Sequence, residues 1–260
     1  MSVRSLDGKK CLITGAGSGI GRATALRASE VGAGGGTVSM AKALDISDYD
    51  EVVKFGTEIH TQFSSMDVVM NIAGISAWGT IENLEHRHWK SMVDVNLMGP
   101  IHVMETFVPS MIRAGKGGHL VNVSSAAGLL ALPWHAAYSA SKFGLRGVSE
   151  VLRFDLKRHG IGVSLVVPGG VKTPLVGTVE IAGIDRSDPR VEKLTHRFEA
   201  RAVSPEKVAS CILRGIERNT YLVYTSNDIR FGYWWARKFA LPYEFVMQKA
   251  NDQFSKLLKR

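Results

Sequence analysis

The sequence KCLITGAGSGIG, at residues 10–21, decides the fold, because an apolar run passes through a glycine-rich turn into a helical pattern. Residues 10–14 predict a buried strand, and residues 20–31 predict a helix. The glycines permit a tight turn and a close approach of the backbone to a ligand. Free N–H groups at the start of the helix, together with its dipole, favour an anion. The stretch therefore predicts a turn that binds a pyrophosphate, and an incidental glycine-rich turn is the alternative.

The rest of the chain alternates short apolar runs with longer helical patterns, as in strand–helix–strand units stacked around a parallel sheet. The helix expected at 138–158 carries one apolar stripe that includes Leu145, Val148 and Leu152. We therefore expect an α/β fold with a doubly wound parallel sheet in a three-layer α/β/α arrangement, and a single domain over residues 1–260. Further strands are expected at 37–44, 66–71, 119–123, 162–167 and 221–224, and further helices at 48–63 and 88–109.

The connection between the first predicted helix and the next predicted strand is too short for this fold. Only residues 33–36 (AGGG) separate them, whereas a parallel crossover needs a dozen or more residues with its helix. Our hypothesis is that roughly 20 or more residues have been lost between Gly32 and Gly36. A break wider than the ~3.8 Å between neighbouring Cα atoms would support it, and an unbroken, ordered turn would contradict it.

Composition places the chain among soluble globular proteins. Hydrophobic residues make up 45% and charged residues 22%, which excludes disordered, collagen-like and coiled-coil classes. No apolar run reaches the roughly 18 residues of a membrane span, and the first ten residues lack an apolar signal core, so we expect a cytoplasmic location. Cys11 and Cys211 are expected to be reduced. The formal charge of +8 favours anionic ligands, but without a recognisable nucleic-acid module we expect no nucleic-acid partner.

Tyr138 and Lys142, in YSASK, lie one turn apart on the same face of a predicted helix. A tyrosine acts as a base near neutral pH only if its pKa falls from about 10, and three pKa units cost about 4 kcal/mol. An ammonium at about 5 Å supplies about 3 kcal/mol at an effective dielectric constant of about 20. Ser125 follows the predicted 119–123 strand and carries a hydroxyl able to donate to a substrate oxygen. A lone Tyr-x-x-x-Lys pair is usually a surface pair, but its combination with Ser125 and the glycine turn predicts an acid–base site.

With these motifs in view, the chain resembles the short-chain dehydrogenase/reductase family over nearly its whole length. The sequence TGAGSGIG at 14–21 is similar to the TGxxxGxG cofactor motif of the family, and NIAG at 71–74 is similar to its NAG motif. The resemblance implies a Rossmann-type fold and hydride transfer between an alcohol carbon and the nicotinamide of NAD(P).

The resemblance also assigns a catalytic tetrad of Asn96, Ser125, Tyr138 and Lys142. It implies that Tyr138 exchanges the hydroxyl proton and that Ser125 orients the substrate oxygen. It further implies that Lys142 binds the nicotinamide ribose and that Asn96 holds a water in the proton relay. A regulator that only senses the dinucleotide would not need this proton relay, so the tetrad favours an enzyme.

Cofactor choice is less determined, because the strand end that distinguishes NAD from NADP in the family is missing from the sequence. Members that use NADP often have a basic residue before the middle glycine; here it is Ser18, so the cofactor is NAD or NADP with a preference for NAD. His86 and His88 face apart on a helix, so we assign no metal. The residues that the resemblance places at the cofactor are Gly15, Ser18, Gly19, Ile20, Gly21, Asp45, Ile46, Asn71, Ala73, Gly74, Tyr138, Lys142, Pro168, Gly169, Val171 and Thr173.

The segment 129–135 (LLALPWH) and the loop 175–201 resemble the substrate pocket and the mobile lid of the family. The first is mostly apolar, so a lipophilic alcohol or ketone is the expected small-molecule substrate. Trp134 and His135 are candidates for substrate contact; the alternatives are an aromatic packed against the lid and an exposed histidine. The resemblance also implies a homodimer or homotetramer built in part on the 138–158 helix.

Residues 228–260 form an amphipathic C-terminal extension that is aromatic and basic. It either lies on a membrane surface or packs on the body or a partner subunit, and the second reading is favoured. Three functions remain: the favoured NAD(P)-dependent alcohol/ketone oxidoreductase, a dinucleotide-binding redox sensor, and a membrane-associated lipid or retinoid reductase. After Pro242, the apolar residues at helical spacing are Tyr243, Val246, Met247, Ala250, Phe254, Leu257 and Leu258.

Overall fold

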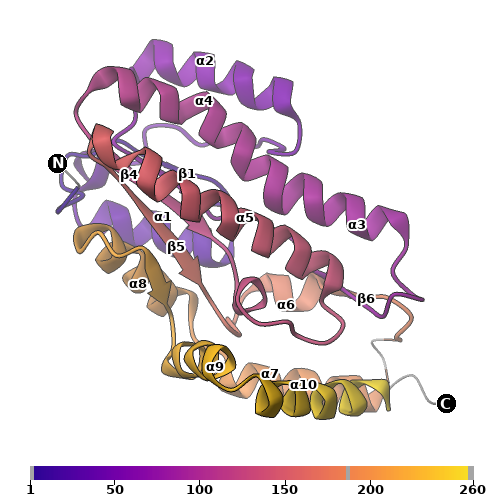
Figure 1. The fold of residues 1–260 in the computed structure, drawn as a ribbon. Coiled ribbons are helices and arrows are strands. Elements are labelled where there is room, and N and C mark those ends of the chain that lie inside the picture. The colour runs from indigo at the N-terminus through magenta and orange to yellow at the C-terminus, as the bar shows by residue number, and fades with distance from the viewer. Residues whose placement is uncertain (1–2, 186–187, 257–260) are drawn as a thin grey trace.

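The computed structural model describes residues 3–185 and 188–256 (Figure 1). Its strands are β1 (Cys11–Ile13), β2 (Val68–Asn71), β3 (Ala77–Trp78), β4 (Gly118–Val123), β5 (Ile161–Val167), β6 (Glu180–Ile181) and β7 (Leu222–Tyr224). Its helices are α1 (Gly19–Glu30), α2 (Tyr49–Phe63), α3 (His86–Val93), α4 (Gly99–Ala114), α5 (Ala136–Asp155), α6 (Pro174–Thr178), α7 (Pro189–Arg201), α8 (Pro205–Glu217), α9 (Asn227–Lys238) and α10 (Ala240–Ser255).

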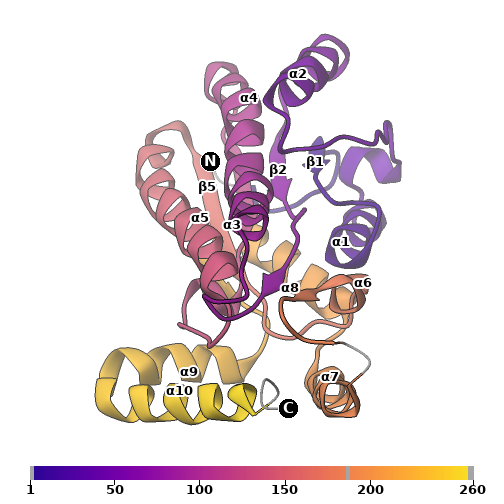
Figure 2. The same cartoon turned by 90° about the vertical axis from the view of Figure 1, so that its right-hand side faces the viewer.

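The main sheet is parallel and has the strand order β1-β2-β4-β5-β7. Helices α2, α4 and α5 cover one face of this sheet, and α1 and α8 cover the other (Figures 1 and 2). The predicted α/β fold, a Rossmann-type parallel sheet between two helical layers, is therefore confirmed.

The alternation of side chains along the central strands builds one core on each face of the sheet. Leu120 of β4 lies in the core beneath α4 and α5, whereas its neighbour Val121 lies in the core beneath α1 and α8. Buried strands without polar alternation are what a sheet covered on both faces requires. Leu145 belongs to the first core, with Val148 and Leu152 packed against it, so the apolar stripe of α5 faces the sheet rather than a second subunit.

The chain runs without a break from α1 into a 3₁₀ turn at Ala33–Gly36. Gly32 and Gly34 have φ angles of 86° and 59°, which glycine adopts without strain. The N–H of Gly34 donates to the carbonyl oxygen of Lys9 at 2.9 Å and holds the turn beside the start of β1. The prediction that residues had been lost here is therefore wrong, and a glycine turn stands where we expected a strand and a helix.

This short turn leaves β1 as an edge strand, paired only with β2 in the main sheet of the described residues. The prediction of a strand at 37–44 is also wrong, because this segment is irregular. Ala41, Lys42 and Ala43 are residue types that strands disfavour, and the irregular segment leaves the outer edge of β1 unpaired within the described residues.

The helix predicted at 88–109 is interrupted. A π-helical turn at Asp94–Met98 separates α3 from α4, and Pro100 lies in the first turn of α4. Proline has no N–H, so it cannot donate to the carbonyl of Asn96 four residues earlier. The π-turn therefore marks a real change in the hydrogen-bond pattern beside a predicted site residue.

The remaining segments add helices where the sequence predicted a loop. The 175–201 segment contains α6, β6 and α7, and β6 pairs with β3 in a separate small sheet. The C-terminal extension forms α9 and α10, while its last predicted apolar residues, Leu257 and Leu258, lie outside the described residues. Over the described part of the chain, every helix is too short or too polar to cross a bilayer.

Candidate active site

The glycine turn after β1 forms one end of the site. Helix α1 begins at Gly19, and its N-cap Ser18 makes no side-chain hydrogen bond to the first N–H groups. Gly15 has a φ of 70°, and a Cβ there would lie 2.8 Å from the Cα of Ala73. A Cβ on Gly21 would lie 2.0 Å from the carbonyl oxygen of Gly15. The turn therefore requires glycine at both positions, and its N–H groups remain available to an anion.

Thr14 joins the glycine turn to the loop after β2. Its Oγ1 accepts hydrogen bonds from the N–H groups of Ile72 and Ala73, at 3.0 and 3.2 Å. Asn71 instead directs its side chain into the sheet, where Nδ2 donates to Oδ1 of Asn122 at 2.9 Å. Because Asn71 is only 1% exposed, its side chain joins β2 to β4 rather than lining the cleft.

A cavity of about 1130 Å³ opens beside the glycine turn and continues along β1. Its far end is lined by Phe55, Phe63 and Phe107, and no strand of the described residues lies outside β1 to close it. The predicted cofactor residues in its lining are Gly15, Ser18, Gly19, Ile20, Gly21, Asp45, Ile46, Ala73, Gly74 and Thr173.

The charged lining of this cavity includes two cations that the sequence analysis missed, Arg22 and Lys42. Lys42 is paired with Glu58 at 2.6 Å, whereas Arg22 is exposed one position after the glycine motif. The position of Arg22 in the first turn of α1 was the sequence signal that could have identified it. Asp45 accepts hydrogen bonds from the N–H and Oγ of Ser47, and these bonds lower the pKa of its carboxyl below the usual value.

Three predicted cofactor residues after β5 lie outside the lining of this cavity. Val171 is buried and forms a parallel bridge with Val203. The carbonyl oxygen of Pro168 accepts a hydrogen bond from the N–H of Ala126 at 2.7 Å. A Cβ on Gly169 would lie 2.7 Å from a side-chain carbon of Ile229. These residues join the end of β5 to neighbouring segments.

The predicted acid–base residues converge beyond the ends of β4 and β5. The hydroxyl of Ser125 lies close enough to that of Tyr138 to lower the pKa of the phenol, and Ser125 Oγ accepts from the N–H of Ala127 at 3.1 Å. Lys142 lies one turn along α5, with Nζ 5.8 Å from the centroid of the Tyr138 ring. The Nζ donates to the carbonyl oxygen of Val123 at 3.1 Å, which leaves further N–H donors on this amine.

Asn96 connects this cluster to the loop after β2. Its Oδ1 accepts from the N–H of Ile75, and its Nδ2 donates to the carbonyl oxygen of Ile75, both at 2.9 Å. A Cβ on Gly74 would lie 2.9 Å from Asn96 Oδ1 and 3.4 Å from Lys142 Nζ. Gly74 therefore brings the π-turn, the loop and Lys142 together, and the structure collects all four residues of the predicted tetrad.

The pKa values differ from the sequence expectation. Burial raises the pKa of Tyr138, and the hydrogen bond with Ser125 acts in the opposite direction. Burial also lowers the pKa of Lys142 to about 8. The prediction that Lys142 brings the pKa of Tyr138 towards neutrality is therefore wrong for this structure. The reason is that the lysine shares the buried environment, which disfavours both charged forms.

Trp134 and His135, at the end of the predicted substrate segment, contact different parts of the structure. Trp134 packs against Phe254 of α10, with ring centroids 5.5 Å apart, and has an unusual positive φ of 66°. His135 stacks on Trp78 with centroids 4.4 Å apart, and its ring centroid lies 6.2 Å from that of Tyr138. Burial lowers the pKa of His135. The structure thus places His135 beside Tyr138, buried rather than exposed, and Trp134 against the C-terminal extension.

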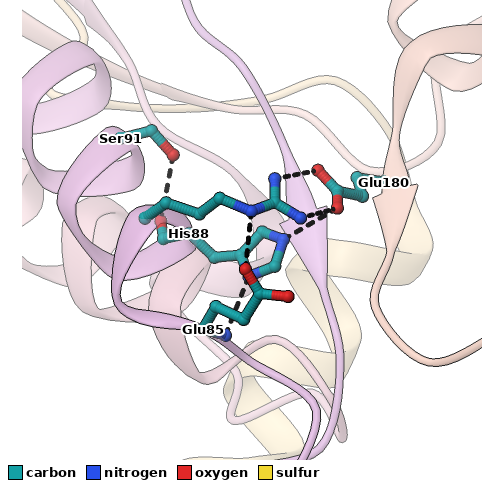
Figure 3. Close-up of polar contacts among 5 residues, drawn as sticks. Glu85, His88, Ser91 and Glu180 are labelled. Carbon is teal, nitrogen blue, oxygen red and sulfur yellow. Dashed lines mark hydrogen bonds and ion pairs between the residues drawn. The ribbon is translucent and has the colours of Figure 1, made fainter.

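A polar cluster joins α3 to β6 at the start of the predicted lid (Figure 3). The guanidinium of Arg87 donates twice to the carboxylate of Glu180, at 2.6 and 3.0 Å. His88 Nδ1 accepts from the N–H of Glu85, so Nε2 carries the proton and donates to Glu180 at 2.9 Å. The hydrogen bonds from Arg87 and then His88 lower the pKa of Glu180 to about 2. These bonds hold the first part of the 175–201 segment against α3.

His86 and His88 do not form a pair, because His86 is exposed and His88 is buried in this polar cluster. In residues 3–185 and 188–256, no group of three or more His, Cys, Asp or Glu side chains has a metal-binding arrangement.

Comparison with known proteins agrees with this arrangement. The family model described as short chain dehydrogenase matches residues 28–182. SadH of Mycobacterium tuberculosis (strain ATCC 25618 / H37Rv), which carries the name of an oxidoreductase, is 34% identical over 82% of this chain and 84% of its own length. The 3-oxoacyl-[acyl-carrier-protein] reductase FabG of Thermotoga maritima is 30% identical over 80% of this chain and 90% of its own length.

A solved structure gives the same result at the level of the fold. A short chain dehydrogenase/reductase from Burkholderia phymatum, in complex with NAD, superposes with a TM-score of 0.80 and is 25% identical. The match covers 91% of this chain and 95% of that protein.

Proposed function

The chain belongs to the short-chain dehydrogenase family and is a dehydrogenase or reductase, and we propose that it interconverts a secondary alcohol and a ketone or aldehyde with NAD(P). The observation that carries this proposal is the Ser125 hydroxyl beside that of Tyr138, with Lys142 one turn away. This arrangement supports proton transfer to a substrate oxygen that contacts both hydroxyls.

The glycine turn fits the pyrophosphate of a dinucleotide. Gly15 and Gly21 leave no room for a Cβ, and the N–H groups at the start of α1 have no side-chain cap. Gly74 and Thr173 extend the same lining towards the acid–base residues. When bound, the dinucleotide supplies the carbon that accepts or releases the hydride and, when oxidised, a positive charge beside the phenol.

Tyr138 is the proton donor and acceptor of the proposed reaction. Its raised pKa keeps the phenol protonated at neutral pH, which is the form that protonates a carbonyl oxygen during reduction. Ser125 orients that oxygen with its hydroxyl. In the reverse direction Tyr138 takes the proton of the alcohol, and a positive charge nearby favours this step by stabilising the phenolate.

Lys142 and Asn96 support Tyr138 in different ways. The N–H donors of Lys142 that Val123 does not use are available to bind ribose hydroxyls. The side chain of Asn96 is occupied on both sides by the backbone of Ile75. The backbone carbonyl oxygen of Asn96 receives no hydrogen bond from Pro100, because proline has no N–H. We therefore assign the water of the proton relay to this backbone oxygen.

The proposed substrate is lipophilic, because the 129–135 segment is mostly apolar and Trp78 lies against His135 beside Tyr138. NAD is the preferred cofactor, since Ser18 is neutral and the comparison structure from Burkholderia phymatum contains NAD. Arg22 is an exposed cation of the lining directly after the glycine motif, so measured use of NADP would be traced to it first.

We also propose a cytoplasmic homodimer or homotetramer. The outer face of α5 exposes Phe143, Val151 and Phe154, which supports a subunit contact on this helix. Cys11 and Cys211 are free thiols, as expected in a reducing compartment. Light scattering during gel filtration tests the assembly, and a strictly monomeric protein would contradict it.

The deciding experiment is a panel of secondary alcohols and ketones, assayed by nicotinamide absorbance with NAD and with NADP. We expect turnover of apolar substrates by the natural protein and a loss of about 100- to 10,000-fold in Tyr138→Phe. Dinucleotide binding should be retained for the most part in this variant, because the glycine turn and Lys142 are untouched. Turnover that survives Tyr138→Phe would refute the assigned acid–base residue. Tight binding without turnover of any substrate would instead identify a redox sensor.

A further inference from the structure

The two C-terminal helices are held to the body by one face each. In α9, Ile229 is buried, and the hydroxyl of Tyr233 accepts from Arg146 of α5 at 2.9 Å. In α10, the hydroxyl of Tyr243 accepts from the N–H of Ala131 at 2.8 Å, and Phe254 packs on Trp134. The opposite faces of both helices therefore point away from the body, and the two helices lie side by side (Figures 1 and 2).

These outward faces carry large apolar side chains that we call the tail patch: Phe231, Trp234, Phe239, Leu241 and Phe245. Phe231 and Trp234 share one face of α9, and Leu241 and Phe245 share one face of α10. The rings of Phe231, Trp234 and Phe239 form a continuous group, with centroids 5.7 Å apart for Phe231 and Trp234 and 6.0 Å apart for Trp234 and Phe239. Side chains this large, gathered and exposed, mark an interaction surface.

The tail patch is flanked by cations. Arg230, Lys238 and Lys249 are all exposed, and in the described part of the chain none of these three forms an ion pair with a carboxylate. Lys249 lies over the ring of Phe245, 4.5 Å from its centroid. Across residues 228–260 there are seven lysines and arginines against three aspartates and glutamates. The surface is therefore apolar at its centre and positive at its rim.

This charge pattern distinguishes between two kinds of partner. In a two-fold contact between copies of the chain, the same patch would face itself, and the unpaired cations would meet their own copies. An anionic lipid surface instead offers phosphates to the cations and an apolar layer to the rings. Aromatic side chains favour the headgroup level of a bilayer for the same reason.

We propose that the tail patch binds the surface of a bilayer that contains anionic lipids. The helices lie in the plane of the headgroups, with the aromatic rings and Leu241 inserted and with Lys238 and Lys249 on lipid phosphates. This attachment does not depend on the proposed dehydrogenase activity, because no residue of the tail patch belongs to the acid–base cluster or to the cavity lining.

The test is co-sedimentation of the full-length protein with phosphatidylcholine vesicles, with and without phosphatidylserine. We expect at least about a 10-fold stronger partition to the vesicles with phosphatidylserine, since each cation near such a surface contributes about 1 kcal/mol. Added salt should weaken the binding, because exposed charges are screened.

Matched variants locate the surface. Leu241 is 78% exposed on the tail patch, and Ile81 is 74% exposed elsewhere. Leu241→Ser should weaken partition by about 10-fold, as expected for an inserted leucine, while Ile81→Ser should leave it unchanged. Lys238→Glu should weaken binding only to the anionic vesicles. Because these side chains are exposed, all three variants should keep the thermal unfolding midpoint of the natural protein.

Two results would overturn the proposal. One is partition that is the same for both vesicle types, or equal in Leu241→Ser and Ile81→Ser. The other is an absence of vesicle binding together with dissociation of an oligomer by Leu241→Ser in light scattering, which would show that a second copy of the chain covers the tail patch.

Discussion

The main sheet is packed more completely at its centre, around β4 and β5, than at its edge, at β1. Around β4 and β5, every strand residue is buried, both faces are covered, and the acid–base residues lie within reach of one another. At β1, the residues are only partly buried, the outer edge is unpaired within the described residues, and a glycine turn stands where we expected a strand and a helix. The groups that would hold the pyrophosphate lie at the carboxyl end of β1. The glycine turn and the acid–base cluster can therefore form beside an incomplete sheet edge.

The largest expected effect lies at the centre of the sheet, where the acid–base residues follow β4. Ser125→Ala removes the hydroxyl that lies beside Tyr138 and should lower kcat by about 100- to 1000-fold, as for the loss of one donor to a reacting oxygen. The matched control is Ser139→Ala on the next helix, whose hydroxyl is buried without a hydrogen-bond partner. Steady-state assays should show normal turnover in the control. A similar loss in both variants would contradict a specific role for Ser125.

Stability should show the same contrast. Leu120→Ala in β4 removes a side chain that is 0% exposed and should cost about 2–5 kcal/mol in the free energy of unfolding. Leu12→Ala in β1 removes a partly buried side chain, and we expect about half that loss or less. Urea unfolding of both variants measures the difference. Equal losses would mean that the edge strand is packed as firmly as the centre.

The glycine turn should tolerate substitution at one position and not at another. Gly15→Ala places a Cβ 2.8 Å from Ala73 in a backbone with positive φ, at a cost of about 1–3 kcal/mol, so dinucleotide affinity should fall about 10-fold or more. Gly17→Ala meets no atom within 4 Å and should bind normally. Fluorescence titration with NADH compares the two. Equal affinities would remove the turn from the proposed cofactor site.

The smallest expected effect is a dependence of stability on pH. Burial lowers the pKa of His119 in β4 to about 4, from 6.5 in the unfolded chain. Below pH 6.5, His119 binds a proton in the unfolded chain but stays neutral in the folded chain. The free energy of unfolding therefore keeps its full value above pH 6.5 and falls as the pH drops towards 4. At pH 5.5 the loss is about 1.4 kcal/mol.

The control for this prediction is the peripheral helix α2. Burial also lowers the pKa of His60, but this residue is more exposed than His119. Unfolding curves at pH 7 and 5.5 should lose most of their difference in His119→Gln and little of it in His60→Gln. The reverse ranking would contradict the assignment.

The sequence correctly predicted the strands and helices whose ends are marked by apolar runs and turn residues. The strands around 119–123 and 162–167, and the helix that carries Tyr138, lie within a few residues of their predicted bounds, because apolar runs and turn residues mark their ends. The 37–44 segment remains irregular, because after Thr37 and Val38 it contains Ala41, Lys42 and Ala43, which strands disfavour. The π-turn at Asp94–Met98 had no periodic signal, and Pro100 was its one visible trace.

The candidate site follows the same rule. Motif spacing predicted the members of the cluster, and the structure brings Asn96, Ser125, Tyr138 and Lys142 together. The pKa values could not be predicted from spacing, because they depend on burial of both the phenol and the amine. Asn71 was assigned to the cleft from its motif, but its buried side chain instead pairs with Asn122, a contact between residues 51 positions apart.

The contact between Trp134 and Phe254 has a thermodynamic consequence. Trp134 immediately precedes His135, which packs beside Tyr138, so a single short segment touches both the acid–base cluster and α10. If a ligand beside His135 shifts this segment, the affinity of the tail for its own partner changes by some factor. Linkage then requires that attachment of the tail change the affinity for that ligand by the same factor, whichever event occurs first.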